Sequence, residues 1–266
     1  MPLSLGYSFQ WDRVKRYADP AFRHRPAPGL VLLDSAARPI LLAGMATSGE
    51  SFEFDVVAST DLRESTLTRA VALFRSSYRA ASDAYLMQSL ARIRFIATAT
   101  SADTLAGFAL GEMRLMDLPR LPLQPVALAG ICCVDPRFRR RGLFRELEWR
   151  AFMAAGIPLR PRVLSCGRLA HPASFRTMTW NPSHVPKPHT PPTTWQREIG
   201  AIIAKAYGAK GFDPDTFVCI GGGTPMHALI EMDVGAEEWE VFAAVNRDRG
   251  DSLLGLCWMP DAPAGW

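Results

Sequence analysis

The chain has 266 residues, of which 48% are hydrophobic and 21% charged, which is enough apolar material for one large domain or two small ones. Its formal net charge of +4 is too weak to predict nucleic-acid binding by itself, but it suits a polyanionic ligand. Charged residues, glycine or proline interrupt every apolar stretch before about 18 residues, which argues against a transmembrane helix. The N-terminus lacks a basic segment followed by an apolar core, so we expect a cytoplasmic protein.

The first part of the chain predicts a strand followed by two helices. Residues 1–50 form an accessory segment with two short apolar runs of strand character, and apolar and acidic residues then alternate over 52–56 as in a half-buried strand. Residues 61–92 carry apolar residues at helical spacing with a polar interruption near the middle, which favours two successive helices. Asp61 and Glu64 have the spacing of a capping box at the start of the first helix.

The next part predicts strands around one helix. Residues 94–100 and 104–116 are β-rich runs joined by a short polar linker, as in a hairpin. The apolar run 124–134 predicts a central strand that is buried on both faces. A helix is then predicted between Gly142 and Gly156. That helix places Leu143, Leu147, Ala151 and Ala154 on one face and pairs Glu146 with Arg150, and it is followed by a strand over 162–169 and a short helix over 172–180.

The last part, residues 181–266, is expected to complete the same domain. Five prolines fall within 181–192, and because proline fixes φ and has no N–H, we expect this segment to be stiff and unable to pair in a sheet. We also consider it as a rim or lid over a substrate pocket. Beyond it the sequence predicts a helix over 195–207, strands over 217–220 and 252–259, and a surface turn at 221–225.

The connection between the central strand and the following helix concentrates positive charge. It reads VDPRFRRRGLFRELE over residues 134–148. The first turn of a helix leaves N–H groups unsatisfied and carries about +0.5 elementary charge, and glycine allows another group to approach the backbone closely. Guanidinium groups add bidentate donors for phosphate oxygens. Because the chain has neither a GxxxxGK[ST] nor a GxGxxG motif at a strand-to-helix turn, this loop is the candidate site for a pyrophosphate.

The same stretch resembles motif A of the GCN5-related N-acetyltransferase (GNAT) superfamily. In that motif a strand ending in V-x-P leads into an R/Q-x-x-G-x-G/A loop and a helix; Arg139 and Gly142 match it, whereas Phe144 stands where glycine or alanine is usual. The order of predicted elements from about 52 to 180 is similar to the family's core. The resemblance therefore implies a mixed α/β fold, a largely antiparallel sheet flanked by helices, with a core at 51–180 and extensions at both ends.

The resemblance also implies acetyl-CoA, or another acyl-CoA, as cofactor. Backbone amides of about 139–144 would hold its pyrophosphate, and strands 124–134 and 162–169 would splay apart to admit the acyl thioester. His171 stands where the family commonly has an asparagine that contacts the cofactor, and Met178 stands where the family has a tyrosine general acid. The implied cofactor-binding residues are Cys133, Val134, Arg139, Arg140, Arg141, Gly142, Leu143, Phe144 and His171.

The catalytic residues are harder to read from the sequence. Glu112, in an apolar strand, is the leading candidate for a general base that receives the proton of an attacking amine, with Asp117 as the next. An outward-facing position on the strand would explain Glu112 equally well. Cys166 and His171 are candidates for the acid near the departing thiolate, although a strand cysteine is commonly a core residue and His171 could cap the helix after it.

The function that the resemblance implies is transfer of an acyl group, most simply acetyl, from acetyl-CoA to an amine. Direct attack in a ternary complex is expected, because no Cys–His nucleophile arrangement is visible. The alternatives are a longer acyl group, a carrier-protein donor, a non-catalytic acyl-CoA-binding module, and a basic nucleic-acid-binding protein. The concentration of charge in one loop favours the cofactor over nucleic acid.

The expected partner is a small-molecule amine or a peptide acceptor, without nucleic acid or membrane. Many members of the family are dimers, so a homodimer is compatible with the resemblance. No metal site is expected, because His184 and His189 lack a third ligand and the five cysteines contain no CxxC pair.

Overall fold

The computed structural model describes residues 51–266 apart from 80, 159–160, 222–226 and 229–232. The accessory segment 1–50 and nearly all of the predicted turn at 221–225 lie outside the described residues.

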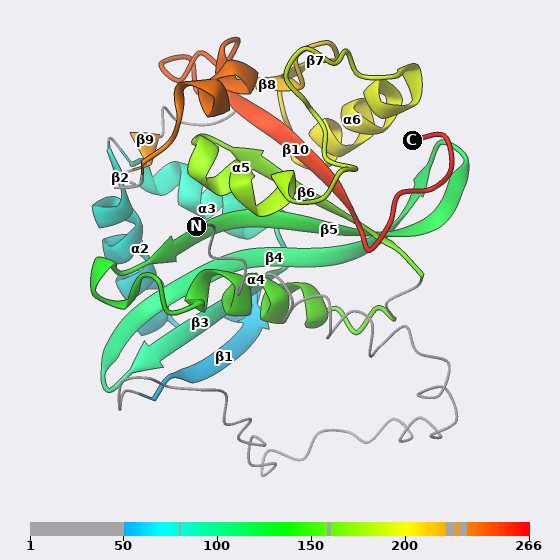
Figure 1. Ribbon diagram of the computed structural model, residues 1–266. Coiled ribbons are helices and arrows are strands. Elements are labelled where there is room, and N and C mark those ends of the chain that lie inside the picture. The colour runs from blue at the N-terminus through cyan, green and yellow to red at the C-terminus, as the bar shows by residue number, and fades with distance from the viewer. Residues whose placement is uncertain (1–50, 80, 159–160, 222–226, 229–232) are drawn as a thin grey trace.

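One large twisted sheet organises the fold (Figure 1). Every neighbouring pair of its strands is antiparallel except β5 and β6, which are parallel. The architecture is therefore mixed α/β with a mostly antiparallel sheet, as predicted. In spatial order the strands are β1 (Glu53–Ala58), β3 (Phe95–Ser101), β4 (Thr104–Leu118), β5 (Leu121–Val134), β6 (Val163–Leu169), β10 (Ser252–Met259), β8 (Val218–Ile220) and β7 (Gly211–Asp213), and a separate pair joins β2 (Tyr78–Arg79) to β9 (His227–Ala228).

The central strands follow from their apolar sequences. The predicted hairpin is the β3–β4 pair, which is in register from Phe95 opposite Gly111 to Ser101 opposite Thr104 apart from one bulge. In β5 the consecutive residues Val126, Ala127 and Leu128 are all buried, so both faces of this strand are covered, as predicted. The prediction of a central strand at 124–134 is thereby confirmed.

Helices cover the two faces of the sheet. On one face lie α2 (Glu64–Ser77), α3 (Asp83–Arg92) and α6 (Thr194–Ala206), whose apolar side chains share a core with Ile96 of β3. The next residue, Ala97, packs on the opposite face with α4 (Leu143–Met153). The short helix α5 (Pro172–Thr179) packs against β10 and the 3₁₀ helix η5 (Ala236–Phe242). No described helix has both the length and the apolarity needed to cross a membrane.

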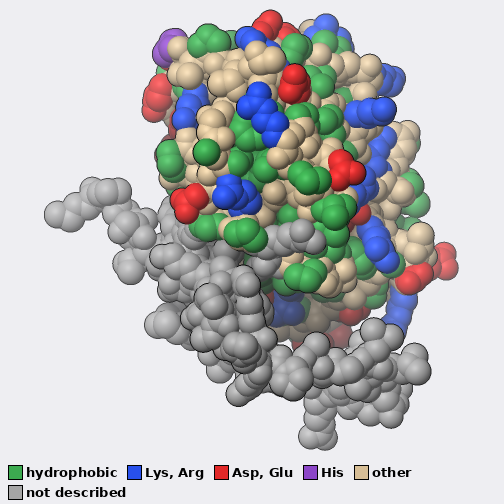
Figure 2. Space-filling model, turned by 90° about the vertical axis from the view of Figure 1, so that its right-hand side faces the viewer, with side chains coloured by type: hydrophobic (Ala, Val, Ile, Leu, Met, Phe, Trp, Pro, Cys, Tyr) green, Lys and Arg blue, Asp and Glu red, His purple; other side chains and the backbone are tan. Residues whose placement is uncertain are grey.

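The surface seen in Figure 2 carries charges of both signs. Lysine and arginine side chains are interspersed there with acidic, apolar and other residues.

The predicted capping box at Asp61 and Glu64 was wrong. Asp61 belongs to a short 3₁₀ helix, η3 (Ser59–Asp61), and α2 begins only at Glu64. The reason is that Leu62 and Arg63 both have extended backbone, with ψ of 123° and 141°, so no helical turn joins Asp61 to Glu64. The prediction of two successive helices in this region is confirmed.

The proline-rich segment does pair with the sheet, contrary to the prediction. The N–H of Val185 donates to the carbonyl of Leu256 at 2.9 Å, and the N–H of Leu256 donates to the carbonyl of Val185 at 2.9 Å. Val185 keeps its own N–H, and β8 pairs only with the first two residues of β10, so the rest of that edge of β10 is available to Val185. Asn181 supports this contact, because its Nδ2 donates to the carbonyls of Trp258 (2.7 Å) and Pro260 (3.1 Å).

We expect Asn181→Ala to destabilise the protein by about 2–4 kcal/mol, because the substitution leaves buried carbonyls without their donor. Its Oδ1 also accepts from the N–H of Ser183 at 2.8 Å, so the substitution would leave that donor without its acceptor as well. The free energy of unfolding in urea is the measurement. Lys187→Ala is the control in the same segment: the Lys187 ammonium is exposed, so its loss should change stability by less than about 0.5 kcal/mol. Equal effects of the two substitutions would contradict this account of the segment.

Candidate functional site

Strands β5 and β6 separate like the arms of a fork. Their parallel pairing covers only Val126–Ala129 opposite Leu164–Gly167. Beyond Ala129, β5 continues to Val134 in contact with β4 on its other side, but it no longer pairs with β6. The strands therefore splay, as the family resemblance implied, and the backbone groups on the inner edge of β5 have no partners in β6.

A cavity of about 560 Å³ opens at this fork. This volume lies within the range of small-molecule sites, which is about 300–1,000 Å³. On one side the cavity is bounded by the end of β5, the loop that follows it, the first turns of α4, the end of β6 and the start of α5. On the other side it reaches α2 and α3 and the residue that ends α6, Tyr207. The cavity thus reaches elements that pack on opposite faces of the sheet.

The basic loop forms the rim of the cavity beside α4. Two residues in it have left-handed backbone, Arg140 with φ of 65° and Gly142 with φ of 78°. Gly142 is the N-cap of α4, and a Cβ built on it would meet no atom within 4 Å, so the space in front of this backbone is open. Because glycine has no side chain to cap the helix, the first-turn N–H groups of α4 stay available to a ligand.

Most of the predicted cofactor-binding residues come together at this rim. Arg141 is the exception, since it does not line the cavity: its guanidinium carbon lies 5.5 Å from the centre of the Phe138 ring. In α4, Leu143, Leu147 and Ala151 are buried as predicted, whereas Ala154 is exposed. The predicted residues that line the cavity are Cys133, Val134, Arg139, Arg140, Gly142, Leu143, Phe144 and His171.

Two of the three predicted catalytic residues do not reach the cavity. Glu112 is 4% exposed and forms an ion pair with Arg114, its neighbour on the same face of β4. Cys166 is fully buried, and burial raises the pKa of its thiol well above the usual value. Both side chains are among the residues that pack the structure, so the structure does not bring either of them to the fork.

His171 does line the cavity, and it caps α5. Its Nδ1 accepts a hydrogen bond from the N–H of Ala173 at 3.1 Å, and the ring packs edge-on against Trp239. Burial, followed by the nearby positive charges of Arg247 and Arg176, lowers the pKa of His171. The imidazole is therefore neutral at neutral pH, with its proton on Nε2, because Nδ1 is the acceptor.

Tyr207 spans the closed end of the fork. Its hydroxyl lies 2.9 Å from the carbonyl oxygen of Ala129 in β5 and 2.8 Å from that of Cys166 in β6. Burial is the largest cause of a pKa for this hydroxyl well above its usual value, so it stays protonated. The sequence analysis missed this residue, because position 207 reads only as the last apolar site of an amphipathic helix.

Among the residues that the structure describes, Glu148 supplies the carboxyl group in the cavity lining. It lies on α4, one turn after Phe144 and one turn before Phe152. Burial alone raises its pKa to about 8, and its charge contributes to raising the pKa values of Cys132 and Tyr207. A carboxyl group with a strongly raised pKa in a cleft marks a candidate catalytic acid or base. The signal in the sequence was one acidic residue in an apolar stripe at four-residue spacing.

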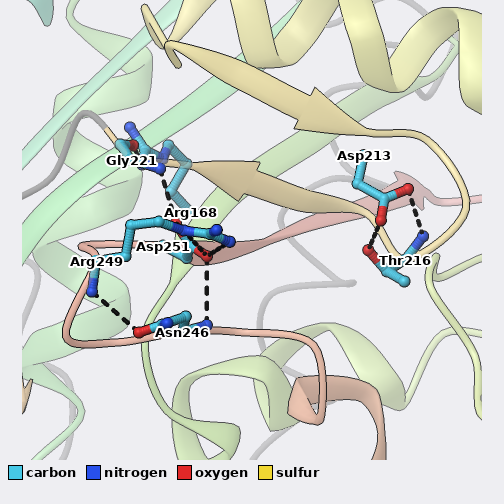
Figure 3. A network of polar contacts seen from close by, with 7 residues as sticks. All are labelled: Arg168, Asp213, Thr216, Gly221, Asn246, Arg249 and Asp251. Atoms are coloured by element: carbon cyan, nitrogen blue, oxygen red, sulfur yellow. Dashed lines mark hydrogen bonds and ion pairs between the residues drawn. The ribbon is translucent and has the colours of Figure 1, made fainter.

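The wall of the fork opposite the basic loop is tied to the far strands of the sheet. Arg168, near the end of β6, lines the cavity and donates to Ser252 Oγ at 2.8 Å and to the carbonyl of Gly221 at 3.2 Å. Asp251 in turn accepts from the N–H groups of Gly221 and Asn246 and from the guanidinium of Arg249 (Figure 3). The end of β6 is thereby held in place by side chains from outside the fork.

The raised pKa of Glu148 predicts a stability that depends on pH. In the unfolded chain a glutamate titrates near about 4.3, so between about pH 5 and pH 8 the folded protein holds a proton that the unfolded chain has lost. Stability contributed by this group is present at low pH and falls as the pH rises through about 8. We expect Glu148→Gln to remove that loss, because glutamine does not ionise. The free energy of unfolding of the variant minus that of the parent should therefore be roughly 1–3 kcal/mol larger at pH 9 than at pH 5. Urea unfolding of both proteins at the two pH values measures it, and a constant difference would contradict the buried carboxyl.

No family model and no curated protein matches this chain. Solved structures that it resembles include a CoA complex of the aminoglycoside N-acetyltransferase AAC(6')-Iy, with a TM-score of 0.37, 16% identity, and coverage of 50% of this chain and 86% of that chain. Another is Arabidopsis thaliana NAA60 in complex with acetyl-CoA, with a TM-score of 0.36, 15% identity, and coverage of 47% and 80% respectively. A GCN5-related N-acetyltransferase from Kribbella flavida has a TM-score of 0.33, 13% identity, and coverage of 51% and 33%. Two of these three structures are described as N-acetyltransferases, and the third is described as a complex with acetyl-CoA.

Proposed function

We propose that this protein is an acyl-CoA-dependent N-acyltransferase that transfers an acyl group, most simply acetyl, to an amine. The observation that carries the proposal is the cavity at the β5–β6 fork, which has a basic loop and an open helix N-terminus at one end and a partly buried carboxyl group with a raised pKa along its wall. These features suit, in that order, a polyanionic donor and the activation of an amine.

The donor fits the side of the cavity that carries the basic loop. A pyrophosphate group needs several converging donors, and the first-turn N–H groups of α4 together with Arg139 and Arg140 supply them. The space in front of Gly142 admits the group without a clash. The amides of a pantetheine arm need backbone partners, and the inner edge of β5, which has no partners in β6 beyond Ala129, offers them. A long, flexible thioester would therefore be held much as an added strand is.

The chemistry then requires little from the protein. The amine nitrogen forms a bond to the thioester carbonyl carbon, the carbon–sulfur bond breaks, and Glu148 receives the proton that the nitrogen releases. Direct attack is supported because burial raises the pKa of Cys132 well above its usual value and that of Cys133 to about 12, so neither cavity thiol is a ready nucleophile. Neutral His171 has an Nε2–H that can donate a hydrogen bond to the departing thiolate.

Binding of acetyl-CoA tests the donor site. We expect the parent protein to bind acetyl-CoA, and Arg139→Glu or Gly142→Glu to weaken binding by roughly tenfold to a hundredfold, because each puts a carboxylate where a phosphate would lie. Isothermal titration calorimetry measures the affinities. Arg141→Glu is the matched control, since it makes the same change of charge in the adjacent position but outside the cavity lining. Equal losses in all the variants would indicate only a general effect of charge, and no binding by the parent would overturn the proposal.

Glu148→Gln tests the enzyme. We expect a loss of about 10²–10⁴-fold in kcat with unchanged affinity for acetyl-CoA, because one general base contributes about that much. In the parent protein kcat/KM should rise with pH to a plateau above about 8, since the base must be deprotonated. Glu146→Gln is the control: it lies on the same helix, pairs with Arg150 and does not line the cavity. An acyl-CoA-binding module without catalysis would bind acetyl-CoA but form no product in either protein.

A further inference from the structure

We infer that the acceptor is a small amine that also carries a carboxylate, of the kind found in α-amino acids with apolar side chains, and that Arg92 binds the carboxylate. This inference rests on the proposed function and names the substrate class of the same cavity. It concerns the part of the cavity formed by α2 and α3, which we call the acceptor side and which Ser77, Tyr78, Tyr85, Ser89, Arg92 and Ile93 line.

Charge on the acceptor side is positive. Arg92 is the last residue of α3 and lines the cavity, and no carboxylate among the described residues forms an ion pair with it. One of its N–H donors, on Nη1, is used by the carbonyl of Tyr207 at 2.6 Å. A guanidinium has five such donors, so a bidentate pair of them remains for a ligand anion.

The acceptor side also holds oxygen atoms that suit an amine. The hydroxyl of Ser89 donates its hydrogen to the carbonyl of Tyr85 at 2.8 Å, and that of Ser77 donates to the carbonyl of Leu73 at 2.8 Å. Both oxygens can therefore only accept from a ligand, and an amine is a donor. Ser89 and Arg92 are three residues apart on one helix, so their side chains are neighbours separated by about 5–6 Å at Cβ. An acceptor for the amine and a cation for the carboxylate are thus as close as the two groups of an α-amino acid require.

The remaining walls select against highly charged acceptors. Ile93 is buried, and the rings of Tyr78 and Tyr85 supply aromatic surface, which favours an apolar or aromatic side chain. An acceptor with several ammonium groups would need several carboxylates, whereas the cavity lining contains Glu148 as its acidic residue beside the arginines. Desolvating additional ammonium groups without partners is unfavourable. The arrangement therefore fits one amine and one carboxylate rather than a polycation.

The test compares acceptors that differ only in the carboxylate. Acetyl transfer from acetyl-CoA would be measured for phenylalanine and leucine, for their amides, and for spermidine. We expect kcat/KM to be at least about tenfold higher for each amino acid than for its amide, the size expected for one charge-assisted interaction. The amide has the less basic amine, so at neutral pH a larger share of it is unprotonated, and a preference for the acid cannot come from the supply of free amine. Amides that react as well as the acids, a preference for spermidine, or acetyl-CoA binding without transfer to any of the amino acids would each overturn the inference.

Arg92 is tested by the ratio of acid to amide rather than by activity alone. Arg92 also binds the carbonyl of Tyr207 at the end of α6, so Arg92→Met could lower activity through the fold. A structural loss lowers both members of a pair equally, whereas loss of a carboxylate partner brings the ratio toward one. Arg92→Lys keeps the charge and should keep part of the preference, which leaves a test if Arg92→Met does not fold. Acetyl-CoA affinity should be unchanged in both variants; failure of the parent to bind acetyl-CoA would instead count against the proposed function.

Discussion

The central constraint on this structure is that β5 and β6 pair as parallel strands over only four residues and then separate. Separated strands leave N–H and C=O groups without partners in the middle of a sheet, which is unfavourable unless a ligand or other groups satisfy them. Tyr207 meets this demand at the closed end, where its hydroxyl reaches a carbonyl of each strand. Beyond that point the backbone is left for a ligand.

The elements around the fork are each stabilised from outside it. β4 pairs with the whole length of β5, the Arg168 contacts hold the end of β6, and α4 buries Leu147 and Ala151 against the sheet. These contacts hold the walls of the cavity from outside it, and Tyr207 joins the two strands at the closed end. This rigidity is what a transfer reaction needs, since both reactants must be held with little freedom before attack.

The charged side chains along the cavity fall into separate groups, one suited to binding a polyanion and one suited to receiving a proton. Arginines stand at the loop before α4, where a polyanion would lie, and Arg92 stands on the acceptor side. Glu148 lies between apolar neighbours, and burial raises its pKa to about 8, so it would act as a base for an amine most effectively above that pH. Glu112, in contrast, forms an ion pair with Arg114 and does not line the cavity.

The sequence by itself determined the order of the elements and the place of the basic loop. Alternation in β1, the hairpin of β3 and β4, the apolar run of β5 and the Gly142 turn are local patterns, each produced by neighbouring residues. Most of the predicted site residues that line the cavity fall within one stretch of chain, from Cys133 to Phe144, for the same reason. The sequence did not indicate contacts between residues that are far apart in the chain and meet across the sheet.

Tertiary structure alone decided which side chains meet at the fork. Tyr207 and Arg92 are 115 positions apart and are brought together because α3 and α6 contribute to the same core on one face of the sheet. Glu112 and Glu148 are both acidic residues in apolar surroundings, and only the packing of β4 and α4 keeps one away from the cavity and places the other in its lining. Likewise, Val185 pairs with β10 because the neighbouring strand is short, which no local pattern in a proline-rich segment could reveal. Burial and charge pairing arise from distant parts of the chain, so they set the chemistry of individual residues only after folding.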